Sequence, residues 1–392
     1  MPIAAKMAEF IKRSSWIRAM FENGAKLKAE VGAENVFDFS LGNPFVEPPE
    51  SFYRALERLA RDHTPGSHGY MPNAGYPQVR QKVADMLNRA TGLDFGPNEI
   101  IMTVGAAGAA NITFKALLNP GDEVVVPAPY FVEYDFYADN HGGKVVPVPC
   151  GEGFSLDPAA IGEAIGERTA AVMINSPNNP TGAVYSQKQL EELAKVLDEA
   201  GRRLGRPIYL ISDEPYRRIV FDGIEVPQVF MAYPHSIVCT SFSKDLSLAG
   251  ERLGYAAVHP QAHDKEHLLA AMVLANRILG FVNAPGIMQK VVGEILEDSA
   301  DLRQYTQKRH MICQVLEEAG FEFHKPQGAF YVFPKSPIED DVAFVKEAMK
   351  EYLLLVPGSG FRGPGHFRVA FCCPDEVIER SAPAFKRLRE RF

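Results

Sequence analysis

Signals for a membrane or a secretory route are missing from this sequence. Its 392 residues contain no apolar run that approaches the ~20 residues needed to cross a bilayer. The first 16 residues include basic side chains but lack the apolar core of a signal peptide. We therefore expect neither a membrane partner nor secretion, and we take the cytoplasm as the expected location.

Cysteine is scarce and shows no pattern of a disulfide framework or a metal site. The five cysteines, an odd number, include no CxxC pair and no His-rich partner pattern. The adjacent Cys372 and Cys373 allow a redox pair as one reading, whereas buried free thiols are the commoner state in an intracellular enzyme. We predict free thiols and no bound metal.

An excess of positive charge is also absent. Lys and Arg together number 41 against 49 Asp and Glu, which gives a formal net charge of -8 and no support for nucleic-acid binding. Repeats, low-complexity tracts and Gly/Ser linkers are missing as well. What remains is an ordinary globular composition, 46% hydrophobic and 23% charged. A chain of this length favours two domains over one.

The middle of the chain repeats one pattern, a short β-branched run followed by a loop and a helix. Helical patterns cover residues 106–118 and 186–200 between such runs. Alternation of this kind indicates an α/β domain with a mainly parallel sheet. The predicted strands are residues 99–104, 123–126, 144–148, 170–175, 208–212 and 236–240.

The two ends of the chain differ in character from its middle. Apolar residues at helical spacing predict a helix within residues 1–31, and residues 37–44 resemble a strand that runs into a turn. Further elements are predicted as a long helical stretch over 285–318, strands at 329–333 and 367–371, and a helix at 342–352. We expect a smaller α+β domain built from residues 1–45 and 286–392, beside a large domain of residues 46–285.

Ligands of open α/β sheets gather outside the carboxyl ends of the strands, so the residues that follow each predicted strand are candidates. Gly105, Ala106 and Ala107 come after the first strand and open a helix. Free N–H groups and the positive end of the helix dipole suit a phosphate there, with close backbone packing as the alternative. Tyr130 and Phe131 follow the second strand, and either ring could stack on a flat ligand or fill the core.

Polar residues follow three of the later strands. Asn179 lies in a loop that either points an amide at a ligand or forms a turn before the next helix. Asp213 follows an apolar strand, so it caps a helix or pairs with a protonated ring nitrogen. Lys244 follows Ser241, and an apolar setting would make its amine nucleophilic, with a surface lysine as the alternative. Arg252, eight residues further on, could complete a phosphate site.

Taken together, these residues resemble the class I/II aminotransferases of pyridoxal 5'-phosphate (PLP) fold type I, the aspartate aminotransferase-like family. The most specific motifs are Asn179-Pro180-Thr181-Gly182, Asp213-x-x-Tyr216, and Ser241-x-x-Lys244 followed by Arg252. The resemblance runs from about residue 35 to the C-terminus. It implies an α/β fold with a seven-stranded, mostly parallel sheet, and a homodimer with active sites at the subunit interface.

The resemblance also implies a role in cofactor binding for each matching residue. Lys244 would hold PLP as a Schiff base and move the substrate proton, and Asp213 would pair with the pyridinium nitrogen. Asn179 and Tyr216 would hydrogen-bond the phenolic oxygen, and Phe131, in preference to Tyr130, would stack on the ring. The phosphate ligands would be Gly105, Ala106, Ala107, Ser241, Arg252 and, from the neighbouring subunit, Tyr70.

Substrate binding has its own matching residues. Arg368 matches the arginine that clamps the α-carboxylate, for which a bidentate guanidinium is well suited. Gly42 matches the N-terminal segment that closes over the substrate, and Asn179 is a further contact. Arg277 is a candidate for the distal carboxylate of a substrate in the neighbouring subunit, with a helix-surface arginine as the alternative.

The implied activity is a ping-pong aminotransferase with amino acid and 2-oxo acid substrates. Arg277 favours L-aspartate as the amino donor, 2-oxoglutarate is the expected acceptor, and an aromatic amino acid or alanine is the alternative donor. The same site could carry out β-elimination, as in C–S lyases, or decarboxylation. A PLP-binding transcription regulator would need a helix-turn-helix domain, for which too little chain precedes residue 35.

Overall fold

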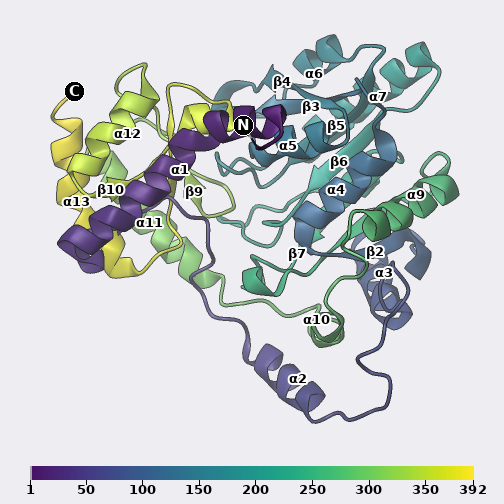
Figure 1. Cartoon of the computed structure of the whole chain (residues 1–392). Coiled ribbons are helices and arrows are strands. Elements are labelled where there is room, and N and C mark those ends of the chain that lie inside the picture. Colours follow the sequence, from purple (N-terminus) through teal and green to yellow (C-terminus); the bar gives the residue numbers. More distant parts are fainter. Residues whose placement is uncertain (1) are drawn as a thin grey trace. The chain divides into compact units, whose positions relative to one another are not determined.

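The computed structural model describes residues 2–392 and, for residues 12–22, the backbone alone. The chain forms two compact units (Figure 1). The larger contains Pro44–Gln304 and Gln327–Ala329, and the smaller contains the segments up to Asn43, Tyr305–Pro326 and Phe330–Phe392. Residues 286–304 thus belong to the larger unit, whereas the sequence placed them with the C-terminal part. The division into functional domains stays a prediction.

A seven-stranded sheet forms the centre of the larger unit, in the order β2-β8-β7-β6-β5-β3-β4. Its strands are β2 (Ile100–Thr103), β3 (Glu123–Ala128), β4 (Lys144–Pro149), β5 (Thr169–Asn175), β6 (Tyr209–Asp213), β7 (Ser236–Ser241) and β8 (Gly254–Val258). β8 runs antiparallel to both of its neighbours, and the remaining pairs are parallel. The predicted α/β fold with a mostly parallel seven-stranded sheet is confirmed.

Strand β8 was missed because its composition is weak for a strand. Ala256 and Ala257 are fully buried, yet alanine has a low strand propensity. Close packing requires the small residues here: a Cβ at Gly254 would lie 2.2 Å from the carbonyl oxygen of Thr240. Close backbone approach, which sequence periodicity does not report, therefore selects the residues of β8.

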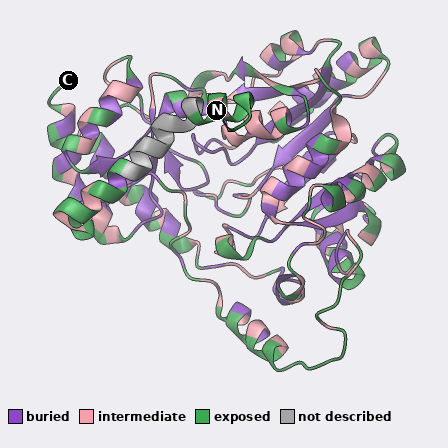
Figure 2. Cartoon of the chain, viewed as in Figure 1, coloured by how far each residue is buried: buried purple, intermediate pink, exposed green. Residues whose placement is uncertain are grey.

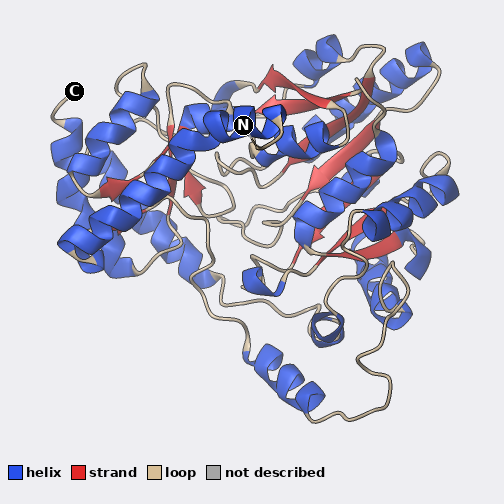
Figure 3. Cartoon of the chain, viewed as in Figure 1, coloured by secondary structure: helices blue, strands red, loops and turns tan. Residues whose placement is uncertain are grey.

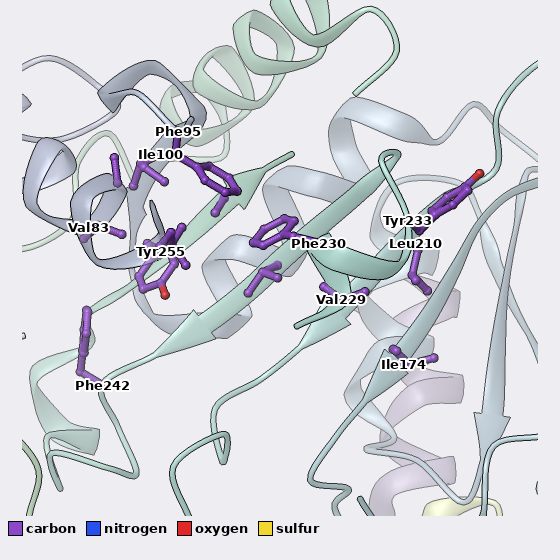
Figure 4. Close-up of a cluster of buried hydrophobic side chains, with 14 of the residues drawn as sticks. Val83, Phe95, Ile100, Ile174, Leu210, Val229, Phe230, Tyr233, Phe242 and Tyr255 are labelled. Carbon is purple, nitrogen blue, oxygen red and sulfur yellow. The ribbon is translucent and has the colours of Figure 1, made fainter. Parts of the chain in front are cut away.

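Apolar side chains cover both faces of this sheet, as expected for a parallel sheet enclosed by helices. Along each strand alternate residues enter one core or the other, so Leu210 and Ile211 lie in different clusters. Figure 4 shows one of the two clusters, in which Phe95, Phe230 and Tyr255 pack over the sheet. The strands are buried along most of their length (Figure 2), except the edge strand β4, in which only Val148 is buried.

Most helices of the larger unit pack around this sheet, whereas the helix over residues 50–60 lies away from it (Figure 3). The helices of this unit are α2 (Glu50–Ala60), α3 (Pro77–Thr91), α4 (Gly105–Leu117), α5 (Glu133–Asn140), α6 (Pro158–Ala164), α7 (Gln187–Leu204), α8 (Val229–Ala232), α9 (Lys265–Ile278) and α10 (Gly286–Val292), with short 3-10 turns η2 (Pro97–Glu99), η3 (Glu152–Phe154) and η4 (Ala249–Glu251). The predicted helices at 106–118 and 186–200 correspond to α4 and α7.

The long helix predicted over residues 285–318 is wrong. The structure has α10, then a turn-rich segment over residues 293–302, and then α11 (Arg303–Glu318). Gly293 follows the last turn of α10, and Asp298 and Ser299 favour turns over helix. Apolar residues of the same segment, Ile295 and Leu296, are buried in the core of the larger unit, which explains why the segment still shows an apolar pattern.

The smaller unit is an α+β structure built from both ends of the chain. Its strands are β1 (Phe37–Asp38) parallel to β10 (Leu353–Leu354), and a separate antiparallel sheet β11 (Val356–Pro357), β12 (Phe367–Ala370) and β9 (Tyr331–Val332). Its helices are α1 (Ala5–Val31), most of α11, α12 (Asp341–Lys350) and α13 (Asp375–Arg389), with 3-10 turns η1 (Ala33–Asn35) and η5 (Gly358–Phe361). Aromatic pairs such as Phe344 with Phe367, 4.8 Å between ring centroids, fill its core.

Two further features bear on the sequence predictions. Within residues 2–392, no helix is both long enough and apolar enough to cross a membrane. All five cysteines are free thiols, of which Cys150 is half-buried and the other four are buried. The predicted free thiols are confirmed.

Candidate active site

The polar residues that were predicted from sequence lie at one edge of the large sheet. β5, β6 and β7 are parallel neighbours, so their carboxyl ends meet at the same edge. Asn175 pairs in register with Asp213 at the ends of β5 and β6, and Ser241 is the last residue of β7. The loops that carry Asn179 and Lys244 leave the sheet from these same ends.

Asp213 is a buried carboxylate of which one oxygen accepts a hydrogen bond and the other accepts none from the described residues. The hydroxyl of Tyr134 donates a 2.5 Å hydrogen bond to Oδ2, while Oδ1 is buried and has no hydrogen-bond partner among the described residues. Burial raises the pKa of Asp213 to about 7, the hydrogen bond from Tyr134 opposes this rise, and the charge of Glu214 adds to it. Such a carboxylate suits a cationic N–H donor at Oδ1.

Tyr134 was not predicted as a site residue. It lies in α5, is 1% exposed, and belongs to the apolar core on one face of the sheet. Its ring stacks on Tyr130, with 6.1 Å between ring centroids and an interplanar angle of 11°. A buried tyrosine usually finds a partner for its hydroxyl, but sequence spacing gave no sign that the partner would be Asp213.

Asn175 is a second residue that the sequence interpretation overlooked. Its side-chain amide donates to the carbonyl oxygen of Asp213 at 2.8 Å and accepts the N–H of Asn179 at 2.7 Å. Asn178 braces the same loop by accepting from the N–H and the hydroxyl of Thr181. The buried Asn179 is therefore fixed relative to Asp213 through Asn175. A buried asparagine that ends an apolar strand is the signal that could have identified it.

Lys244 lies in the turn that follows β7, in a loop of residues 242–248. Its Nζ is 5.9 Å from the centroid of the Tyr216 ring, which belongs to the turn after β6 and is 4% exposed. The loop is closed by a hydrogen bond from the N–H of Leu248 to the carbonyl oxygen of Phe242. The structure thus places Lys244 and Tyr216 near one another, at the edge that also holds Asp213.

The predicted phosphate ligands form a corner at the start of α4. Gly105 has φ 78°, and a Cβ added there would lie 3.0 Å from Nη2 of Arg252. No side chain caps the helix at Val104, so its first N–H groups remain available. Ala106 and Ala107 follow, both half-buried and without a hydroxyl, and Ser241 is buried. The guanidinium and the helix N-terminus together provide positive potential for an anion.

Phe131 and Tyr130 differ in their surroundings. Tyr130 is 1% exposed, and its hydroxyl donates to Asp135 at 2.8 Å, which places it in the core. Phe131 is half-buried and meets Tyr134 edge to face, with 5.7 Å between ring centroids. Of the two aromatic residues, Phe131 is the one that retains exposed surface for a ligand.

Tyr70 and Arg277 are both exposed on the larger unit. Tyr70 is 96% exposed in the loop between α2 and α3, and Arg277 lies in the last turn of α9. Their segments are linked because Asn276 donates to the carbonyl oxygen of Asn73 at 2.8 Å and Asn73 donates to that of Val282 at 3.0 Å. The two predicted inter-subunit residues are therefore carried by one hydrogen-bonded surface region.

The smaller unit brings Arg368 and Gly42 together around Tyr331. Arg368 is 7% exposed, donates to the carbonyl oxygen of Ser40 at 2.6 Å, and lies 4.6 Å from the ring centroids of both Tyr331 and Phe361. A Cβ at Gly42 would lie 1.9 Å from the Tyr331 hydroxyl, so a larger residue there would displace the Tyr331 ring. Stacking fixes the plane of the guanidinium, and sequence spacing did not identify Tyr331.

Comparison with known proteins identifies the family. Residues 34–385 match the sequence model of "Aminotransferase class I and II". An aspartate/prephenate aminotransferase of Thermus thermophilus is 32% identical over 362 residues, which cover 89% of this chain and 90% of that protein. An aspartate aminotransferase of Pyrococcus horikoshii is 30% identical, over 95% of this chain and 94% of that protein.

Solved structures give the same result. An amino transferase from Eubacterium rectale superposes with a TM-score of 0.96 at 39% identity, over 100% of this chain and 99% of that chain. The aspartate aminotransferase of Thermus thermophilus with maleate superposes with a TM-score of 0.87 at 30% identity, over 99% of this chain and 100% of that chain. This chain belongs to the class I and II aminotransferases and is a transaminase of that family.

Proposed function

We propose that this chain is a PLP-dependent enzyme that moves the amino group of an L-amino acid, L-aspartate first, to 2-oxoglutarate by a ping-pong mechanism. The observation that carries the proposal is the buried carboxylate of Asp213. Its Oδ2 is held by Tyr134, and its Oδ1 is buried without a partner among the described residues. A protonated pyridine nitrogen is a cationic donor that would satisfy this oxygen.

The surrounding residues fit the rest of the cofactor. Lys244 would hold PLP covalently, Asn179 and Tyr216 would donate to its phenolic oxygen, and Phe131 would stack on the ring. When bound, PLP supplies an electron-withdrawing ring that stabilises negative charge at the substrate Cα. Its phosphate would meet the guanidinium of Arg252, the Ser241 hydroxyl and the backbone N–H groups of Gly105, Ala106 and Ala107.

Proton movement is the task that we assign to Lys244. When it is not bonded to the cofactor, the amine of Lys244 would act as the general base that takes the proton from the substrate Cα and holds it on Nζ until the proton is returned. Asp213 would keep the ring nitrogen protonated throughout, because ionisation of a buried carboxylate is favoured only beside a cation. Tyr134 would hold the carboxylate in place by its hydrogen bond to Oδ2.

Arg368 would bind the α-carboxylate of the substrate through the N–H groups at the edge of its guanidinium. The rings of Tyr331 and Phe361 pack against that guanidinium. Gly42 would let the N-terminal segment pass close to that site. The names of the relatives, and the complex of one of them with maleate, support a dicarboxylic substrate. In a homodimer, the exposed Tyr70 and Arg277 would act on the neighbouring site, Arg277 at the distal carboxylate.

The first experiment is a visible absorbance spectrum of the purified protein loaded with PLP. We expect the band of lysine-bound PLP in wild type and its loss, together with activity, in Lys244→Ala; full activity in that variant would refute the proposal. A panel of amino donors with 2-oxoglutarate then tests the reaction. Formation of a 2-oxo acid without ammonia supports transamination, whereas ammonia with pyruvate would indicate elimination instead.

A further inference from the structure

The loop that carries Lys244 is buried on either side of the lysine but only partly buried at the lysine itself. Phe242, Leu246 and Leu248 are buried in the core of the larger unit and fix its two sides. Lys244 and Asp245 lie between these anchors and are only partly buried. Apolar burial therefore sets the ends of the loop but leaves the position of the lysine itself to polar contacts.

Asp245 supplies contacts from both its side chain and its main chain. Oδ1 accepts the N–H of Leu246 at 2.9 Å, and Oδ2 lies 3.8 Å from Nη1 of Arg218. Its carbonyl oxygen accepts the N–H of Ala300 at 2.7 Å. The residue next to Lys244 is thus connected to two other segments, the turn after β6 and the turn-rich segment 293–302.

Arg218 completes a closed ring of contacts. It donates to the carbonyl oxygens of Asp298 and Glu297, the latter at 2.8 Å, while it faces Asp245. The ring therefore runs from Asp245 to Arg218, on to residues 297–298, and back through Ala300 to Asp245. Arg218 also lies two residues after Tyr216, so the same ring ties the turn of Tyr216 to the loop of Lys244.

A cavity borders this ring of contacts. The cavity has a volume of about 230 Å³ and is lined by Arg218, Asp245, Phe242 and Tyr255 among others. Empty space next to the pair means that neither side chain is confined on all sides by apolar neighbours. On the side that faces the cavity, the hydrogen bonds and the ion pair are the contacts that constrain these two side chains.

We propose that Asp245 and Arg218 are positioning residues for Lys244, which fix the lysine loop against residues 297–300. The inference rests on the proposed role of Lys244 as the cofactor-bearing lysine. Neither residue is assigned a contact with cofactor or substrate. Their effect on the reaction would be indirect, through the place and direction of the Lys244 amine.

The test uses the PLP-loaded protein and the variants Asp245→Asn and Arg218→Gln. Asparagine keeps an acceptor for Leu246 but removes the charge that faces Arg218, so it isolates the pair. We expect hydrogen exchange of the peptide containing Ala300 to become at least about tenfold faster in both variants. We also expect release of lysine-bound PLP, followed by its visible absorbance, to become severalfold faster.

Glu99→Gln is the matched control. Glu99 accepts the N–H of Gly96 at 2.9 Å with one oxygen and faces Nζ of Lys265 at 2.7 Å with the other, so it repeats the arrangement of Asp245 away from the lysine loop. We expect exchange at Ala300 and PLP release to stay at wild-type rates in this variant. Equal changes in Glu99→Gln would reduce the effect to general destabilisation and overturn the proposal.

A double variant separates a pair from two independent residues. If Asp245 and Arg218 act together, Asp245→Asn with Arg218→Gln changes both rates no more than Arg218→Gln alone does, because that variant already removes the ion pair. Wild-type exchange at Ala300 in both single variants, or effects that multiply in the double variant, would contradict the proposal. Absence of a lysine-bound PLP band in wild type would instead contradict the proposed function. Hydrogen exchange at Ala300 would still test whether Asp245 and Arg218 hold the lysine loop against residues 297–300.

Discussion

Each compact unit buries a charged side chain to which we assign a role in the reaction, and the two units hold these side chains in opposite ways. In the larger unit, Asp213 has a single side-chain hydrogen bond and an oxygen without a partner among the described residues. In the smaller unit, Arg368 lies between the rings of Tyr331 and Phe361 and donates to a backbone carbonyl oxygen. The buried charge of Asp213 thus has few hydrogen bonds to stabilise it, whereas the guanidinium of Arg368 is held in place by two aromatic rings.

This difference corresponds to two different tasks. A buried carboxylate with a raised pKa gains free energy when a cation arrives, so its environment favours a protonated ring nitrogen. A guanidinium that is fixed by stacking loses little conformational freedom when it binds a carboxylate. We therefore expect substitutions at Asp213 to act on the electronic part of the reaction, and substitutions at Arg368 to act on substrate binding.

The largest effect on activity is expected for Asp213→Asn. The amide can no longer stabilise a protonated ring nitrogen, and loss of one partner of a buried charge pair costs about 3–5 kcal/mol, or roughly 10²–10⁴-fold in kcat. Steady-state kinetics with saturating donor measures this loss. A variant within a few fold of wild type would remove the charge at Asp213 from the proposed mechanism.

The same substitution gives a pH test in the protein without PLP. Burial raises the pKa of Asp213 from 3.8 to about 7, so the protonated form is favoured by folding. Its contribution to stability is full below pH 3.8 and is lost as the pH rises through about 7. We expect the Tm of wild type to fall relative to that of Asp213→Asn between about pH 4 and pH 7, by a free-energy difference of at most roughly 4 kcal/mol. Parallel Tm profiles would contradict the uncompensated burial of Asp213.

A smaller effect is expected for Arg368→Lys. An ammonium keeps the charge but loses the planar fork and its fit between two rings, which corresponds to a charged hydrogen bond of about 1.5–3 kcal/mol, or roughly 10–100-fold in kcat/KM. The loss should appear mainly in KM for the amino acid, and the visible band of lysine-bound PLP should persist. A loss confined to kcat would mean that Arg368, like Asp213, acts on the reaction step, and it would contradict the proposed role of Arg368 in substrate binding.

The sequence predicted much of this arrangement because strand ends are local features. An apolar run followed by Asp213, or by Ser241 and Lys244, shows both where the strand ends and which side chain follows it. The partners that fix these residues are not local. Tyr134 reaches Asp213 from a helix, and Tyr331 lies beside Gly42 only because segments from opposite ends of the chain meet in the smaller unit.

The turn-rich segment 293–302 shows a different limit of sequence interpretation. Its apolar residues Ile295 and Leu296 resemble the buried face of a helix, yet they enter the core from a turn. Hydrogen bonds from Arg218 and to Asp245 hold this segment, and those partners are more than fifty residues away. Periodicity reports which residues are buried, but tertiary contacts decide which backbone conformation buries them.

The smallest effect is expected for Arg277→Ala. Unlike Asp213 and Arg368, Arg277 is an exposed charge. Arg277 is exposed in the described chain, so its proposed contact with a distal carboxylate needs a second subunit. We expect kcat/KM for aspartate to fall about tenfold, the value of one hydrogen bond to a charged group, while kcat/KM for alanine changes little. Competition kinetics with the two donors measures the ratio directly, and Arg206→Ala, another arginine outside the site, serves as the control.

Equal losses with both donors would exclude Arg277 from side-chain recognition. The preference for aspartate would then have to come from residues around Arg368, so that the smaller unit would set specificity as well as bind the α-carboxylate.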